Sequence, residues 1–109
     1  MNEVILILTT APADERAEEI ARVLVDERLA ACVNIGAPMI SIYRWQGSVA
    51  REAESQLVIK TTRDRVAAVE TRLRTLHPYE LPEFLVMPVG AASQSYAEWV
   101  SAQTSAPDA

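Results

Sequence analysis

The sequence predicts one α+β domain, in which a single antiparallel sheet carries two helices on one face. Three observations lead to this prediction. The chain has 109 residues and half of them are apolar, which suits one compact domain with one core. Short apolar runs typical of strands alternate with segments whose apolar residues recur at helical spacing. A glycine-containing turn near the middle of the chain joins two of the predicted strands into a long hairpin.

The first half of the chain predicts a strand, a helix and a second strand. Residues 4–10, VILILTT, form a continuous run rich in branched side chains, as in a central strand. A helix is predicted from about residue 14 to residue 29, because acidic residues precede apolar residues at helical spacing. Residues 30–35 predict a strand that is interrupted at Gly36 and Pro38 and resumes at 39–45. Pro38 suits an edge strand or a bulge.

The middle of the chain predicts a hairpin and a second helix. The turn at 46–48 joins residues 39–45 to a strand at 52–61, so residues 39–61 read as one long hairpin. Thr62 and Asp64 are predicted to cap the following helix, whose apolar residues recur between 66 and 76.

The end of the chain predicts a fourth strand and a short helix. Pro78 disfavours helix at His77, and residues 83–89, EFLVMPV, read as a strand. Ser95 and Glu98 predict a capping box for a helix over 96–100. Residues 1–103 are therefore predicted to form the domain, and residues 104–109 a disordered tail.

The resulting order is strand, helix, strand, strand, helix, strand. This order predicts a ferredoxin-like sandwich with a long hairpin and a short C-terminal helix. A weak internal repeat agrees with it, because Thr9 and Thr61 both belong to a Thr-Thr pair at a strand-to-helix junction.

Composition argues against several classes of partner. Ten basic and fifteen acidic residues give a net charge of -5, so neither nucleic acid nor an anionic membrane surface is expected as a partner. No apolar run is long enough to span a bilayer. Cys32 is the only cysteine, which excludes an internal disulfide and favours a cytoplasmic location. Cys32 is either a small buried apolar residue or a functional thiol.

The hairpin predicts an oligomer. Tyr43 and Trp45 point to one of its faces, while Ile40 and Ile42 point to the other. An apolar hairpin exposed on both faces promotes aggregation unless it packs against another subunit, so a closed homo-oligomer is expected. Alternatively, Tyr43 and Trp45 form a surface platform for a ligand.

A polar cluster forms the candidate ligand pocket. Lys60 ends the third strand, and Tyr79 and Glu80 lead into the fourth, so these residues suit a small anionic or zwitterionic ligand. The alternative is an exposed ion pair that contributes little energy. Glu54 alternates with Lys60 along one strand face and is a further pocket or metal position.

His77, the only histidine, and Cys32 are the candidate metal ligands. Selective transition-metal sites usually have three or four N, S or O ligands, so the alternative is a structural role for His77 at the end of the helix. No G-x-S-x-G elbow or glycine-rich phosphate loop occurs in the sequence, and no enzymatic activity is predicted.

Several segments together resemble the CutA family of divalent-cation-tolerance proteins in the PII-like superfamily. The resemblance covers nearly the whole chain and rests on LTTAP, RLAACVNI, SIYRWQG, REAESQLVIKTT and LHPYELPEFLVMPV. It implies a homotrimer of ferredoxin-like subunits, with the hairpin extended onto a neighbour. It also implies a role in tolerance of divalent metal ions such as copper, with weak metal binding.

The resemblance leaves a second function open. The chain also departs from the family pattern at two positions. The alternative function is a PII-like small-ligand sensor, or a structural trimer, with a cleft between subunits. Copper-binding members of the family have a cysteine where this chain has Thr9, and a His-His pair where it has Leu76 and His77. Only His77 of this ligand set is retained.

Overall fold

A computed structural model describes residues 3–105 of the chain. The elements, in chain order, are β1 (Val4–Pro12), α1 (Glu15–Asp26), β2 (Cys32–Ile35), β3 (Met39–Trp45), β4 (Ser48–Thr62), a 3-10 turn (Arg63–Arg65), α2 (Val66–Leu76), β5 (Leu85–Pro88) and α3 (Gln94–Thr104). None of the helices in this described part has the length and apolar character needed to cross a membrane.

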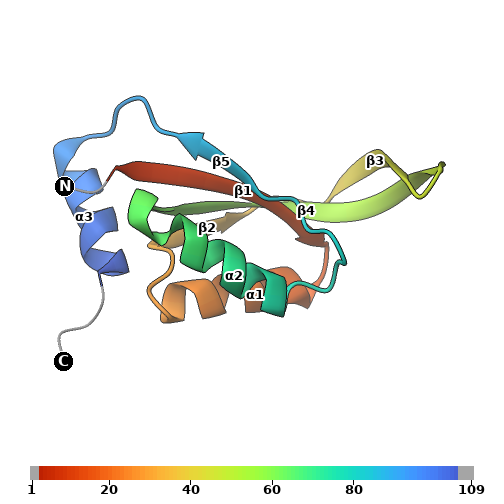
Figure 1. Cartoon of the computed structure of the whole chain (residues 1–109), viewed down its shortest axis with the longest axis horizontal. Helices are drawn as coiled ribbons and strands as arrows, with labels where there is room; N and C mark the ends of the chain where they lie inside the picture. The colour runs from red at the N-terminus through yellow and green to blue at the C-terminus, as the bar shows by residue number, and fades with distance from the viewer. Residues whose placement is uncertain (1–2, 106–109) are drawn as a thin grey trace.

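The strands form one antiparallel sheet in the order β2-β4-β1-β5, and β3 pairs with β4 beyond β2. β4 is the longest strand, with 15 residues, and its inner half lies between β1 and β2. Figure 1 shows α1 and α2 together on one face of this sheet, while the β3–β4 hairpin projects beyond it. The predicted α+β class, with an antiparallel sheet and three helices, is confirmed, but the third helix is not short, because its 11 residues equal those of α2.

The core lies between this sheet and the two helices. Alternate residues of β1 and β4 point toward the helices, and the helix residues that meet them recur at intervals of three and four. The main buried side chains are Ile5, Ile7, Leu57, Ile59, Ile20, Leu24, Val69 and Leu73. Each fully buried aliphatic side chain of this kind stabilises the fold by about 1.5–3 kcal/mol.

α1 begins where predicted but ends earlier. The Asp14 carboxylate caps it by accepting the backbone N–H of Arg16 at 2.9 Å. The helix ends at Asp26 rather than at residue 29, because Arg28 adopts a left-handed conformation with φ of 59°. The Leu24 carbonyl then accepts the N–H groups of both Leu29 and Ala30, which closes the helix end.

The predicted cap of α2 was wrong. The Thr62 hydroxyl donates to the Asp64 carboxylate at 2.5 Å, so these side chains bond to each other and not to the helix backbone. A 3-10 turn at Arg63–Arg65 precedes α2, and Arg65 at its N-cap provides no side-chain hydrogen bond. The helix ends at Leu76 before His77, as Pro78 predicts.

The predicted capping box of α3 was also wrong. Ser93 is the cap, because its Oγ accepts the N–H of Tyr96 at 3.3 Å, and the helix starts at Gln94. Ser95 lies inside the first turn, and Glu98 accepts a hydrogen bond from the Gln94 side chain instead. Thr104, predicted to open the tail, is the last residue of α3 and is buried. Residues 106–109 of that predicted tail lie outside the described residues.

The hairpin has the predicted form, with a tight turn at its tip. Trp45 and Ser48 are opposite each other, and Gln46 and Gly47 between them have φ of 48° and 82°. Positive φ at both central positions is the signature of a type I′ turn, which matches the twist of the strands. β4 begins at Ser48, earlier than the predicted residue 52, because the strand continues to this turn.

A bulge separates β2 from β3, as Pro38 suggests. Ile35 is opposite Leu57 and Met39 is opposite Glu54. The segment from Ile35 to Met39 therefore has one residue more than the stretch of β4 that it faces. The Gly36 N–H donates to the Gln56 carbonyl at 2.8 Å and keeps the bulge attached. The last strand is shorter than predicted, because pairing with β1 begins only at Leu85.

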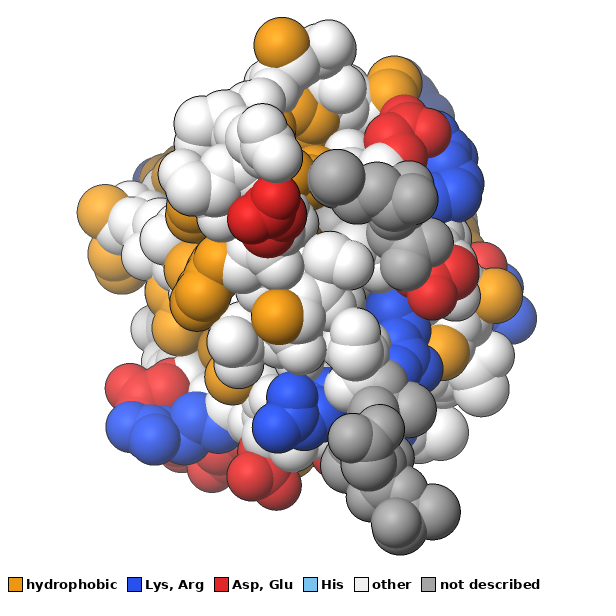
Figure 2. Space-filling view, turned by 90° about the vertical axis from the view of Figure 1, so that its left-hand side faces the viewer, with side chains coloured by type: hydrophobic (Ala, Val, Ile, Leu, Met, Phe, Trp, Pro, Cys, Tyr) orange, Lys and Arg blue, Asp and Glu red, His pale blue; other side chains and the backbone are white. Residues whose placement is uncertain are grey.

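On the second face of the sheet, opposite α1 and α2, one end is covered by α3. There α3 packs Val100 against Val4 and Ala31, and the hydroxyls of Thr62 and Thr104 lie 3.4 Å apart. Farther along this face the side chains are exposed, including those of Leu85, Met87, Met39, Tyr43 and Trp45. Figure 2 views the end that carries α3, where hydrophobic atoms lie among basic and acidic side chains and no single charge sign dominates.

Candidate ligand-binding cleft

A cleft of about 750 Å³ lies at the base of the hairpin. One wall is the hairpin, with the aromatic side chains of Tyr43 and Trp45 and the carboxylate of Glu54. The other wall comes from the return segment, which we define as residues 78–84, between α2 and β5. It contributes Tyr79 and Glu83. The cleft therefore combines aromatic rings with carboxyl groups, which include Glu80, and Arg44 also lines it.

The strand register explains why the cleft lies at this place. Glu54 is opposite Pro12, the last residue of β1, and on its other side it is opposite Met39, the first residue of β3. Beyond Glu54, β4 pairs only with β3, so the sheet narrows from four strands to two. The return segment, with Pro78 and Pro82, passes along this step before it enters β5.

His77 anchors the return segment to β1. Its Nε2 lies 2.6 Å from the Thr10 carbonyl oxygen, and its Nδ1 accepts the backbone N–H of Tyr79 at 3.1 Å. Because a carbonyl can only accept, the ring must carry its proton on Nε2 and keep the lone pair on Nδ1 for Tyr79. Burial lowers the pKa of His77, although the Thr10 carbonyl and the charge of Glu54 act in the opposite direction. The neutral ring is therefore the form that fits this corner.

Neither nitrogen of this ring is available to a metal. Nε2 holds a proton and the lone pair of Nδ1 is engaged, so metal coordination would break one of the two hydrogen bonds that His77 makes. The residue is also buried, with 8% of its surface exposed. The His77 ring also lies against the Tyr79 ring, with centroids 4.6 Å apart. The structure thus gives His77 a structural position at the helix-to-strand junction.

The cleft carries buried negative charge. Glu54 is 7% exposed, and within residues 3–105 no ion pair reaches its carboxylate. Glu83 Oε2 is buried without a hydrogen-bond partner in the same part of the chain. Burial raises the pKa of Glu83, and the nearby charge of Glu54 raises it further. Burial, followed by hydrogen bonding and charge from Glu54, likewise raises the pKa of the Tyr79 phenol.

The structure brings together five of the six residues that the sequence proposes for the pocket. Tyr43, Trp45, Glu54, Tyr79 and Glu80 all line the cleft.

The sixth residue, Lys60, does not line the cleft. It lies opposite Leu6 on β1 and Cys32 on β2, farther along β4 than Glu54. Glu83 is the important residue that sequence reasoning missed. An acid at the entrance of the apolar run FLVMPV, directly after Pro82, was the available signal.

Cys32 and His77 do not form a shared metal site. Cys32 is opposite Lys60, whereas Thr10, which holds His77, is opposite Gln56. Four positions along a strand correspond to about 13 Å. Across residues 3–105, no group of three or more His, Cys, Asp or Glu side chains is arranged to hold a metal ion. The residues present therefore do not fit the copper site that the family resemblance suggests.

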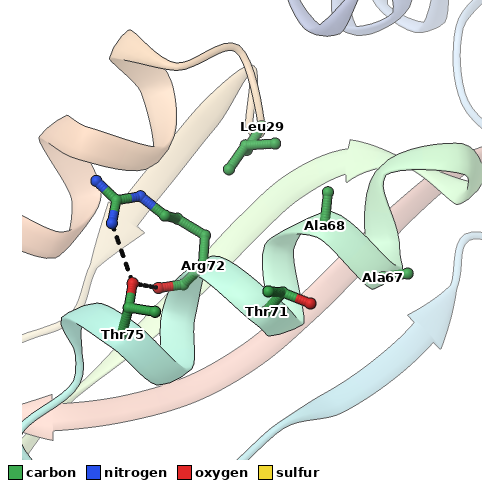
Figure 3. Close-up of a pocket in the computed structure, with 6 residues that line it drawn as sticks. All are labelled: Leu29, Ala67, Ala68, Thr71, Arg72 and Thr75. Atoms are coloured by element: carbon green, nitrogen blue, oxygen red, sulfur yellow. Dashed lines mark hydrogen bonds between the residues drawn. The ribbon is translucent and has the colours of Figure 1, made fainter.

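A second depression, of about 510 Å³, lies on the outer side of α2 (Figure 3). Its surface consists mostly of small side chains beside Leu29, and its one charged group is Arg72. The Arg72 guanidinium donates to both oxygens of Glu27 at 2.8 Å and to the Thr75 hydroxyl at 3.0 Å. These contacts leave the depression without an uncommitted charged group, so the hairpin cleft is the better candidate site.

Comparison with known proteins identifies the family. Residues 5–103 match the family model described as "CutA1 divalent ion tolerance protein". The divalent-cation tolerance protein CutA of Thermus thermophilus is 44% identical over 104 residues, covering 95% of this chain and 99% of that protein. Human protein CutA is 41% identical over 91 residues, covering 84% of this chain and 51% of that protein.

Solved structures give the same result. The crystal structure of CutA from Xylella fastidiosa superposes with a TM-score of 0.91 at 45% identity, covering 94% of this chain and 99% of that one. The structure of CutA1 from Oryza sativa has a TM-score of 0.92 at 33% identity, with 95% of each chain covered. The predicted family is confirmed: the chain belongs to the CutA1 divalent ion tolerance protein family.

Proposed function

We propose that this protein contributes to cellular tolerance of divalent metal ions and does so without catalysis. The observation that carries the proposal is the family match across residues 5–103, together with relatives that are named divalent-cation tolerance proteins. The cleft agrees with a binding role, because its functional groups are carboxyls and aromatic rings and not a nucleophile aligned with a base.

Deletion and complementation test this function. A strain lacking the gene should grow more poorly than its parent at raised Cu²⁺ or Zn²⁺, and the same gene supplied on a plasmid should restore growth. Equal growth of the two strains across the metal series would contradict a role in tolerance.

We further propose that the active form is a homotrimer of ferredoxin-like subunits located in the cytoplasm, without nucleic-acid or membrane partners. The support is the amount of apolar surface that one chain leaves exposed on the hairpin, where Ile42 is 70% and Val49 66% exposed. A second copy that covers the hairpin would remove this surface from water.

Sedimentation equilibrium tests the assembly. The wild-type protein should give three times the mass of the 12.0 kDa chain, and Ile42→Glu should lower that mass. Val25→Glu is the matched control, because Val25 is 43% exposed but lies on α1, outside the hairpin. A monomer mass for the wild type would refute the trimer.

Metal binding through His77 or Cys32 is proposed to be weak, because Cys32 would act as an isolated ligand and binding at His77 would break one of its two hydrogen bonds. Titration of the purified protein with Cu(II), Cu(I) and Zn(II), repeated with His77→Ala, measures this. Submicromolar, stoichiometric binding that disappears in the variant would contradict the proposal.

A second candidate function is a sensor for a small ligand, and the hairpin cleft favours it. The cleft's volume of about 750 Å³ falls within the usual range for small-molecule sites, and its polar groups converge from two separate parts of the chain.

A further inference from the structure

Acidic side chains outnumber basic ones in the cleft, with Glu54, Glu80 and Glu83 against Arg44. Glu54 is more than nine-tenths buried, and Glu83 lies close enough to it for the two charges to influence each other. Neither carboxylate has an ion-pair partner among residues 3–105, although Arg44 also lines the cleft. Buried carboxylates are normally paired with a cation or bound to a metal. The missing component of this site is therefore positively charged.

The aromatic residues specify what kind of cation fits. The side chains of Tyr43, Trp45 and Tyr79 line the same cleft, and aromatic ring faces attract organic cations such as alkylammonium groups. A hard metal ion would require six or more oxygen ligands, and a transition metal would require nitrogen or sulfur. Glu54, Glu80 and Glu83 line the cleft, but within residues 3–105 no three such side chains are arranged to hold a metal ion, and the His77 nitrogens are already engaged.

We propose that the cleft binds a small organic ammonium ion, which donates N–H bonds to Glu54 and Glu83 while its alkyl chain lies against Tyr43 and Trp45. This inference rests on the proposal that the cleft is a ligand site. An ammonium group supplies the donor that Glu83 Oε2 lacks and the positive charge that Glu54 lacks.

A matched set of small probes tests the inference with the purified full-length protein. The probes are n-butylammonium, the neutral analogue 1-butanol, and tetramethylammonium, which has the charge but no N–H donor. Trp99→Phe leaves Trp45 as the only tryptophan, so its fluorescence reports occupancy of the cleft. Butylammonium should bind with saturation, tetramethylammonium at least threefold more weakly, and 1-butanol at least tenfold more weakly.

Substitutions assign the binding to particular groups. In the same Trp99→Phe background, Glu54→Gln and Glu83→Gln should each weaken butylammonium binding at least tenfold. Tyr43→Leu keeps apolar bulk without the ring and should weaken it about threefold. Glu19→Gln, an exposed acid on α1, should leave binding unchanged. Circular dichroism and thermal melting establish that each variant is folded before it is titrated.

Three results would overturn the inference. Equal binding of 1-butanol and butylammonium would show that the cleft recognises only apolar bulk. No saturable signal with a folded trimer would show that it takes no amine, and Arg44 or a cation from a second copy would then neutralise Glu54. Binding of Cu(II) or Zn(II) that requires both glutamates and displaces butylammonium would assign the cleft to a metal. The growth assay with the gene deletion is independent, so tolerance can stand when the amine site fails.

Discussion

Replacing His77 should destabilise the protein strongly. His77→Ala removes the 2.6 Å hydrogen bond to the Thr10 carbonyl and the 3.1 Å hydrogen bond from the Tyr79 N–H. It also leaves a cavity, because the ring is 8% exposed. Two hydrogen bonds contribute about 1 kcal/mol each, and the lost packing adds about 1 kcal/mol more. The expected loss in the free energy of unfolding is about 3 kcal/mol.

The assay is urea unfolding followed by circular dichroism at pH 7.5, with all variants at one protein concentration because subunit association affects apparent stability. His77→Gln is the matched control. Its side-chain amide can reach the Thr10 carbonyl as Nε2 does, so it should recover about 1 kcal/mol of the loss. A loss below about 0.5 kcal/mol in His77→Ala would refute the view that this ring holds the return segment to β1.

The same residue predicts a dependence on pH. Burial lowers the pKa of His77 from 6.5 in the folded protein, so the unfolded chain takes up this proton first as the pH falls. The contribution of His77 to stability is therefore complete above pH 6.5 and decreases below it. His77→Gln should lack this decrease, and a wild type and variant with parallel stability curves between pH 7.5 and pH 5 would contradict the assignment.

The other predictions concern Glu83, Ser93 and Leu73. Glu83→Gln should raise the melting temperature at pH 7.5 by about 4 °C, because a buried, unpaired carboxylate is destabilising by about 1 kcal/mol. Since the pKa of Glu83 is raised from 4.5, its penalty is present at neutral pH and absent once the group is protonated, so the gain should vanish below pH 4.5. Ser93→Ala should cost about 1 kcal/mol in urea unfolding, whereas Ser95→Ala should cost nothing measurable. Leu73→Ala truncates a side chain that is 1% exposed, so it should lower the free energy of unfolding by about 3 kcal/mol. A decrease below about 1 kcal/mol would contradict the place of Leu73 in the core.

Glu83 connects stability with binding. The substitution that should stabilise the empty protein is also the one that should weaken the ammonium site. A gain in stability together with a loss of ammonium binding would identify Glu83 as a functional carboxylate. A gain in stability without a loss of binding would mean that the buried carboxylate only destabilises the protein.

Most of the fold was predictable because its strands and helices have strong periodic patterns. The VILIL run and the alternation along β4 identify the central strands, and the helical spacing of Val69 and Leu73 identifies α2. The errors fall at the ends of helices and strands, and at the helix ends one side-chain bond or one backbone angle decides the boundary. Ser93 and Ser95 are both suitable caps in sequence, and Arg28 gives no warning of its positive φ.

The site was predictable in its residue types but not completely in its geometry. Tyr43, Trp45 and Tyr79 stand out in the sequence, and the structure collects them. Lys60 and Glu54 share a strand face in the sequence pattern, yet six positions along that strand are about 20 Å, which exceeds the reach of both side chains. Glu83 was missed because its burial depends on how the return segment crosses the end of β1, a contact between parts of the chain that are distant in sequence.

The central pairing of β1 with β4 also has a consequence for how the chain folds. Val4 pairs with Thr62, so the middle of the sheet cannot close until more than half of the chain has been synthesised. The β3–β4 hairpin, by contrast, closes through a two-residue turn and can form on its own within microseconds. We expect the hairpin to form early and β1 to join late. The apolar run of β1 therefore stays unpaired during much of translation, when it is most exposed to chaperones and to misassembly.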